Sequence, residues 1–172
     1  MEGKTMKLVI KNKFLSLRGG SKVLDEAGNE AFLVRGKLFS VTKKKYVCDL
    51  QAHNLYMVRN KYWHFLTKKA FIYNNNNEKV AFVKSRFFQW GKNKYIVEGY
   101  KDELRIDGDL FSFNYQIIRN DEVIGTIKRR FEIVPLPDQF TLDIKYDEDA
   151  PFLVALVIAI DNIIDNRNGQ SR

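Results

Sequence analysis

The side chains that could do chemistry fall into two groups: a sparse set of nucleophiles and imidazoles, and a recurring set of lysines. Cys48 is the only cysteine, and His53 and His64 are the only histidines. These are too few for a typical structural zinc site, and no nucleophile elbow, phosphate-binding glycine loop or paired-histidine motif accompanies them. Asp107-Gly108-Asp109 begins like a calcium loop, but the apolar residues after it leave the remaining ligand positions empty. We therefore expect no enzymatic activity, no metal and no cofactor.

The lysines stand in turns that recur along the chain. Val34, Val58 and Val83 anchor three similar units, spaced by 58 − 34 = 24 and 83 − 58 = 25 residues. In each unit an Asp/Asn turn leads to the valine, and a lysine-bearing turn follows. Successive turns of an up-and-down meander lie at opposite ends of the sheet, so the lysine turns should share one rim. The candidate polyanion-binding residues of that rim are Lys43, Lys44, Lys45, Lys68, Lys69, Lys92 and Lys94.

Simpler explanations exist for both the lysines and the aromatic residues beside them. Lysines suit exposed turns and protect sheet edges from aggregation. Trp90 and Tyr95 flank the third lysine turn and could anchor the protein at headgroup depth, or their rings could pack in or over the barrel. Each lysine near an anionic surface contributes about 1 kcal/mol at best. The rim therefore predicts a weak, salt-sensitive contact.

The elements that must position these turns are mainly strands. Residues 13–17, 31–35, 55–59 and 111–117 are rich in residues that suit a pleated surface, and several alternate apolar with polar. Turn signals such as Ala27-Gly28-Asn29 separate them at short intervals. We count about a dozen strands, at the close spacing expected of an antiparallel barrel or sandwich.

One segment near the C-terminus is apolar on every side. A helix over about residues 150–165 would be ~24 Å long at ~1.5 Å per residue, which matches the height of such a barrel. It has no polar face, so it must be enclosed, and a dozen strands leave room for a helix inside. Its expected core residues are Phe152, Leu153, Leu156, Val157, Ile160 and Ile164. The apolar run is too short for a transmembrane span.

Length and charge set the broad class of the protein. The chain has 172 residues, a formal charge of +8 and 45% hydrophobic residues, which indicates one folded basic domain. We expect residues 1–6 to be a flexible N-terminus, residues 7–166 a single barrel domain, and residues 167–172 a flexible tail. The N-terminus lacks the apolar core of a signal peptide, and a single cysteine favours a reducing compartment. The expected location is cytoplasmic, with peripheral attachment to membranes.

The repeated units at Asp25, Asp49 and Asn74, together with the closing apolar helix, resemble the LURP-one-related family of the tubby C-terminal-like superfamily. The resemblance extends from about residue 6 to residue 166. It implies a mainly β fold, a closed antiparallel barrel of about twelve strands around a C-terminal hydrophobic helix. It also implies a non-enzymatic role, because tubby-like domains bind phosphoinositide headgroups through basic residues, and nucleic-acid binding has been proposed for them.

These observations favour a binding or scaffold module whose basic rim contacts anionic lipid headgroups, a phosphorylated ligand or another polyanion. A nucleic-acid-binding or transcription-related protein is the alternative, because residues 61–65 and 86–90 interleave basic with aromatic side chains. No recognition helix, zinc finger or RNP signature supports it. A small-ligand carrier is a further alternative. The sequence leaves the oligomeric state open.

Overall fold

The computed structural model describes residues 5–11, 21–36, 44–60, 69–87, 93–109, 114–130 and 139–168. The strands are β1 (Met6–Lys11), β2 (Ser21–Asp25), β3 (Glu30–Gly36), β4 (Lys45–Cys48), β5 (Asn54–Asn60), β6 (Lys69–Asn74), β7 (Lys79–Phe87), β8 (Asn93–Glu98), β9 (Leu104–Asp109), β10 (Asn114–Arg119), β11 (Glu122–Arg130) and β12 (Gln139–Ile144). A 3₁₀ turn, η1 (Asp147–Asp149), and the helix α1 (Ala150–Asn168) follow them.

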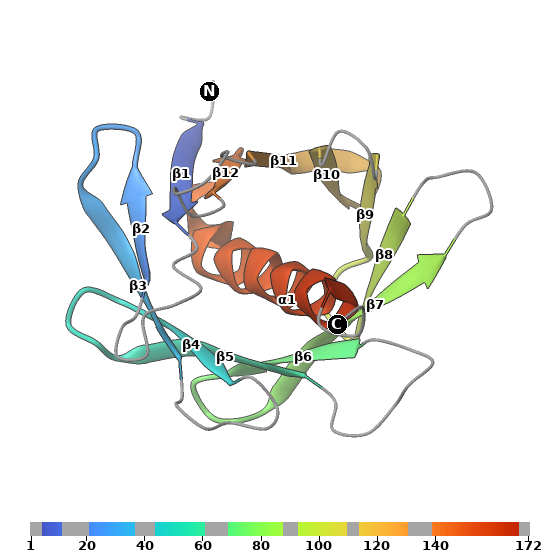
Figure 1. The fold of residues 1–172 in the computed structure, drawn as a ribbon, viewed down its shortest axis with the longest axis horizontal. Helices are drawn as coiled ribbons and strands as arrows, with labels where there is room; N and C mark the ends of the chain where they lie inside the picture. The colour runs from blue at the N-terminus through green and yellow to red at the C-terminus, as the bar shows by residue number, and fades with distance from the viewer. Residues whose placement is uncertain are drawn as a thin grey trace.

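The strands form a closed up-and-down barrel, which confirms the predicted fold class. Each strand pairs antiparallel with its neighbours in sequence, and β1 closes the barrel against β12. Because consecutive strands run in opposite directions, successive connections leave from opposite ends of the barrel. Figure 1 shows α1 running through the middle of the ring of strands.

Alternation along the strands decides which side chains meet the helix. In β12, for example, Phe140, Leu142 and Ile144 are buried while their neighbours are only half-buried. This period of two sends one residue inward and the next outward. The inward residues of the strands and the apolar residues of α1 form a single hydrophobic core.

The helix is enclosed, as its lack of a polar face predicts. Phe152, Leu153, Leu156, Val157 and Ile160 are each at most 3% exposed, whereas the side chain of Ile164 lies outside the described residues. The helix continues to Asn168, past the predicted end at about residue 165. No described helix combines the length and the apolar character needed to cross a membrane.

Two ion pairs connect the helix and its entry to the barrel wall. Where α1 enters, Asp149 of η1 lies 2.7 Å from Nη1 of Arg119 at the end of β10. Eleven residues into α1, Asp161 Oδ2 lies 3.2 Å from Nζ of Lys45 at the start of β4. Asp149 and Asp161 are both buried, so these pairs satisfy carboxylates that burial alone would disfavour.

Asp107-Gly108-Asp109 is part of β9 rather than a loop. Gly108 lies opposite Tyr115 of β10, and a Cβ on Gly108 would stand 2.1 Å from Cδ1 of that ring. The glycine is therefore needed for the buried Tyr115 ring to lie against the β9 backbone, where it also contacts Tyr95 edge-on at 5.6 Å between centroids. This packing gives the glycine a structural role.

Candidate polyanion-binding surface

The two ends of the barrel carry opposite charge. We call the end at which α1 enters the acidic end. The connections there contain nine acidic residues: Glu26, Asp49, Glu78, Asp102, Glu103, Asp121, Asp147, Glu148 and Asp149. Only two lysines, Lys101 and Lys145, accompany them. This arrangement agrees with the prediction that the Asp/Asn turns share one rim.

We call the opposite end, where β3, β5 and β7 finish, the lysine end. The segments that join strands there contain eight basic residues: Lys13, Arg18, Lys37, Lys43, Lys44, Lys61, Lys68 and Lys92. Their only acidic residues are Glu132 and Asp138. Of these ten residues, Lys44 alone lies among the described ones, where it is partly buried. The strand ends nevertheless fix which end of the barrel each segment leaves from.

Lys45 does not belong to the exposed rim. It lies two residues before the buried Val47 and so on the same face of β4, and its side chain points into the barrel and reaches Asp161 of α1. Only 25% of its side chain is exposed. Because Lys45 neutralises a buried carboxylate, it is not available to bind an anion outside the barrel.

Tyr95 also differs from its predicted position. It is 1% exposed and packs inside the barrel, on the same face of β8 as the buried Val97. A buried ring cannot reach a headgroup, so only the packing interpretation fits this residue. Lys43, Lys68, Lys92 and Trp90 lie outside the described residues, as does the side chain of Lys94, and their roles stay predictions.

Lys69 faces outward on β6. Its Nζ lies 5.5 Å from the centroid of the Phe82 ring on β7. Arg59 and Lys84 also face outward near Lys69, and the pattern of turns in the sequence does not identify them. Strict alternation about the buried Val58 and Val83 would have found them, since both residues directly follow an inward valine.

Three turns of the acidic end have the same hydrogen bonds, which gives the sequence repeat a structural basis. In each, the backbone N–H of the fifth residue donates to the side-chain oxygen of the first at 2.8 Å: Asn29 to Asp25, His53 to Asp49, and Glu78 to Asn74. The fourth residue has positive φ in all three: Gly28, Ala52 and Asn77. Asp or Asn is required because its short side chain can cap its own turn.

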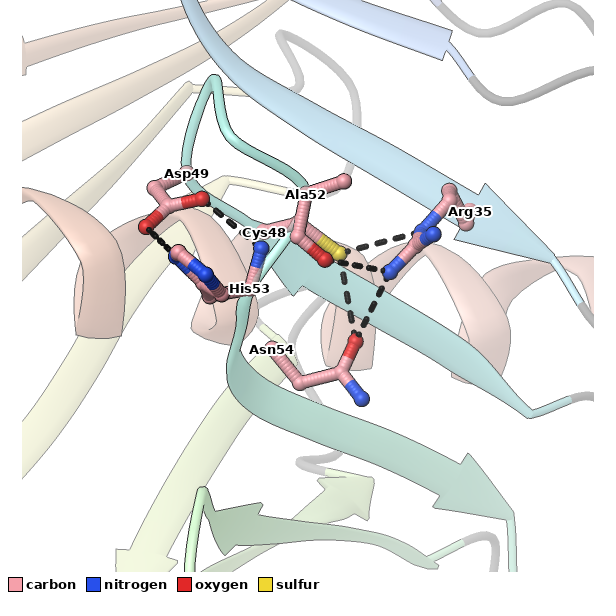
Figure 2. A network of polar contacts seen from close by, with 6 residues as sticks. All are labelled: Arg35, Cys48, Asp49, Ala52, His53 and Asn54. Atoms are coloured by element: carbon pink, nitrogen blue, oxygen red, sulfur yellow. Dashed lines mark hydrogen bonds and ion pairs between the residues drawn. The ribbon is translucent and has the colours of Figure 1, made fainter.

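The carboxylates of these turns are held in the charged form. Hydrogen bonds from the side chain and backbone of Asn29 lower the pKa of Asp25. For Asp49, desolvation opposes the shift, but hydrogen bonds from the backbone and ring of His53 lower its pKa overall. Figure 2 shows the Asp49–His53 pair, with Nδ1 of His53 2.9 Å from Oδ2 of Asp49. The acidic end therefore stays negative at neutral pH.

A second network in Figure 2 covers the cysteine on the outer side of the barrel. Arg35 of β3 donates from Nε to Sγ of Cys48 at 3.3 Å and from Nη2 to the carbonyl of Ala52 at 2.7 Å. Asn54 also contacts both Arg35 and Cys48. Cys48 is fully buried beneath these groups, and the guanidinium ties β3 to the turn before β5. The role of this network is to hold neighbouring strands together.

Aromatic rings pack around the start of the helix. Tyr100 stacks on Phe152 with centroids 4.1 Å apart, and Tyr56 meets Phe152 edge-on at 5.7 Å. Desolvation and the nearby charge of Asp149 raise the pKa of Tyr100 to about 12. Desolvation likewise raises the pKa of Tyr56.

The shift of Tyr100 predicts a loss of stability at alkaline pH. Its phenol should ionise near pH 10 in the unfolded chain and near 12 in the fold, so the fold retains a proton that the unfolded chain releases between these values. The contribution of Tyr100 is present below about pH 10 and lost as the pH rises toward 12. Melting temperatures measured across this range should fall less steeply for Tyr100→Phe than for the parent. A control, Tyr46→Phe, changes a partly buried tyrosine on the outer side; equal slopes for the parent and both variants would contradict the prediction.

Comparisons with known proteins identify a matching family, a relative and a solved structure of similar fold. A family model described as LURP-one-related matches residues 6–161. An uncharacterized protein of Bacillus subtilis (strain 168), YxjI, is 23% identical over 166 residues, which are 96% of this chain and 98% of that protein. The X-ray structure of an Arabidopsis thaliana protein has a TM-score of 0.64 and 17% identity, and the alignment covers 96% of this chain and 93% of that one. At that identity, the structural likeness speaks for the fold alone.

Proposed function

This chain belongs to the LURP-one-related family, and we propose that it is a non-enzymatic binding module whose lysine end contacts an anionic membrane surface. The supporting observation is the separation of charge between the two ends of the barrel, with eight bases against two acids in the connections of one end and nine acids against two lysines in those of the other. An anionic surface attracts the first end and repels the second, so it orients the barrel as well as binding it.

The strength of such a contact is limited. Each lysine close to an anionic bilayer contributes about 1 kcal/mol before salt screening, and micromolar binding needs about 8 kcal/mol. Binding is therefore weak at physiological ionic strength and falls as salt is added. Weak, reversible attachment suits a module that finds its membrane by charge.

Removing charge from the lysine end is expected to abolish vesicle binding. The test is co-sedimentation with phosphatidylserine-containing and neutral vesicles at low and moderate salt. The variant changes Lys43, Lys44, Lys68 and Lys92 to serine, and leaves Lys45 in place because it pairs with Asp161. Four lysines account for at most about 4 kcal/mol, so the partition coefficient should fall by up to about a thousand-fold at low salt.

A matched control removes the same charge elsewhere. Changing Lys7, Lys22, Lys101 and Lys145 to serine also takes the net charge from +8 to +4, but these lysines lie on β1, on β2 or at the acidic end. The control should retain most of the binding. Equal losses in both variants would show that only net charge matters. Binding of single-stranded or duplex oligonucleotides that depends on the lysine end, with no binding to vesicles, would contradict the lipid assignment and point to nucleic acid.

A further inference from the structure

The outer side of β5, β6 and β7 carries cations that lie on aromatic rings. Arg59 lies 4.7 Å from the centroid of the Tyr73 ring, and both Nε and Nη2 donate to its hydroxyl, at 3.1 and 2.5 Å. Lys69 lies 5.5 Å from the Phe82 centroid, and Lys79 lies 6.0 Å from that of Phe71. Because the Phe71 and Phe82 centroids are 6.1 Å apart, these side chains form one continuous cluster, which we call the outer β5–β7 face.

The charge of this face is not balanced locally. Within the described part of the chain, Arg59, Lys69 and Lys79 pair with no carboxylate, although Lys84 beside them pairs with Glu98. Several other described cations on the outside are paired instead. Lys7 pairs with Glu26, Lys22 with Glu30, Arg105 with Asp121 and Lys145 with Glu122. The outer β5–β7 face therefore presents positive charge together with half-buried rings.

The face runs from the lysine end to the acidic end, where Lys79 begins β7. Lys69 is the first residue of β6, next in sequence to Lys68, and Arg59 is the penultimate residue of β5. In the β6–β7 pairing, Lys69 lies directly opposite Lys84, whose charge Glu98 already balances. A layer of anionic groups outside the barrel would balance the charge of Lys69.

We infer that the outer β5–β7 face lies against the headgroup layer of an anionic bilayer, so that the barrel rests on this side as well as on its lysine end. The inference rests on the proposed function and adds an orientation to it. Lysine and arginine supply charge to lipid phosphates, and amphipathic rings suit the headgroup depth. A single-stranded nucleic acid fits less well, because it needs free ring faces for base stacking and a groove to follow. Here each ring has a cation on one face, and the outside of a closed barrel is convex.

A pair of label positions tests the orientation. An environment-sensitive fluorophore is attached through Met57→Cys, which lies opposite Tyr73 in the β5–β6 pairing, or through Gln116→Cys, exposed on β10. Cys48 is fully buried, and the labelled parent corrects for any residual reaction there. With phosphatidylserine vesicles, the label at position 57 should shift to the blue and be quenched by lipids carrying a shallow nitroxide, whereas the label at position 116 should not respond.

Charge removal gives an independent measurement. Lys69→Gln/Lys79→Gln should weaken vesicle binding by up to about thirty-fold at low salt, since each lysine near anionic lipid accounts for roughly a five-fold change. Lys7→Gln/Lys22→Gln removes the same charge from paired lysines and should leave binding nearly unchanged. Vesicle binding that persists while the label at position 57 stays silent, or equal losses in the two double variants, would overturn the orientation and leave the proposed function standing. No vesicle binding by the parent would overturn both.

Discussion

Replacing Ile158 with aspartate is expected to unfold the domain. Ile158 is the ninth residue of α1, is 4% exposed, and belongs to the core that the strands form around the helix. A carboxylate there would be buried without a partner, at a cost of several kcal/mol. Domains of this kind have only about 5–15 kcal/mol of stability in total, so that cost removes a large share of it. Thermal unfolding followed by circular dichroism, with size-exclusion chromatography for association, measures the effect.

A conservative change at the same position separates charge from shape. Ile158→Val removes one methylene and should cost only about 0.5–1.5 kcal/mol. The valine variant should therefore remain folded with a modestly lower melting temperature. A soluble aspartate variant with the melting curve of the parent would mean that α1 is not enclosed, and would contradict the fold itself.

The architecture was predictable because its signals are local. The apolar stretch around Leu153 and Ile160 lacks a polar face, and such a helix is stable only when it is surrounded. The repeat at Asp25, Asp49 and Asn74 was also visible, because each turn is closed by bonds between residues four apart. Period-two alternation and short turns then lead to an antiparallel barrel.

The site was less predictable, because it depends on pairings that are distant in sequence. Lys43, Lys44 and Lys45 read as one turn, yet the strand begins at Lys45 and its side chain points inward. Its partner, Asp161, is 116 residues away. Tyr95 likewise seemed to flank a turn, although one step along β8 decides whether a side chain faces outward or into the core.

The outer β5–β7 face was missed for a related reason. Phe71 and Phe82 lie side by side only because of the β6–β7 register, and the Arg59–Tyr73 contact depends on the β5–β6 register. Within each strand these residues look like ordinary half-buried side chains. The β5–β6 register spans the long connection of residues 61–68, so local turn chemistry does not determine it. The β6–β7 register spans a short turn, but it shifts between Ile72 and Tyr73.

The buried pair at the acidic end gives the second large effect. Arg119→Met is expected to destabilise the protein by about 3–5 kcal/mol at neutral pH, because it leaves the Asp149 carboxylate buried without its partner. Arg119 is 20% exposed and Asp149 only 9% by side chain, so the carboxylate has less access to water than the guanidinium. The same change also removes the contact between Arg119 and the Tyr146 ring, at 5.3 Å.

Acid should partly rescue this variant, and the rescue identifies the cause. Without Arg119, the buried carboxylate of Asp149 carries a charge that no partner balances, and acid removes that charge by adding a proton. The cost of burying the carboxylate should therefore be smaller at low pH than at neutral pH. Urea unfolding at pH 7 and pH 5 should show a smaller difference from the parent at the lower pH. Arg119→Met/Asp149→Leu removes both charges and should recover much of the loss at pH 7. If the single variant loses the same stability at both values of pH, and the double variant recovers none of it, then the lost contact with Tyr146 is responsible, and the ion pair does not hold the start of the helix.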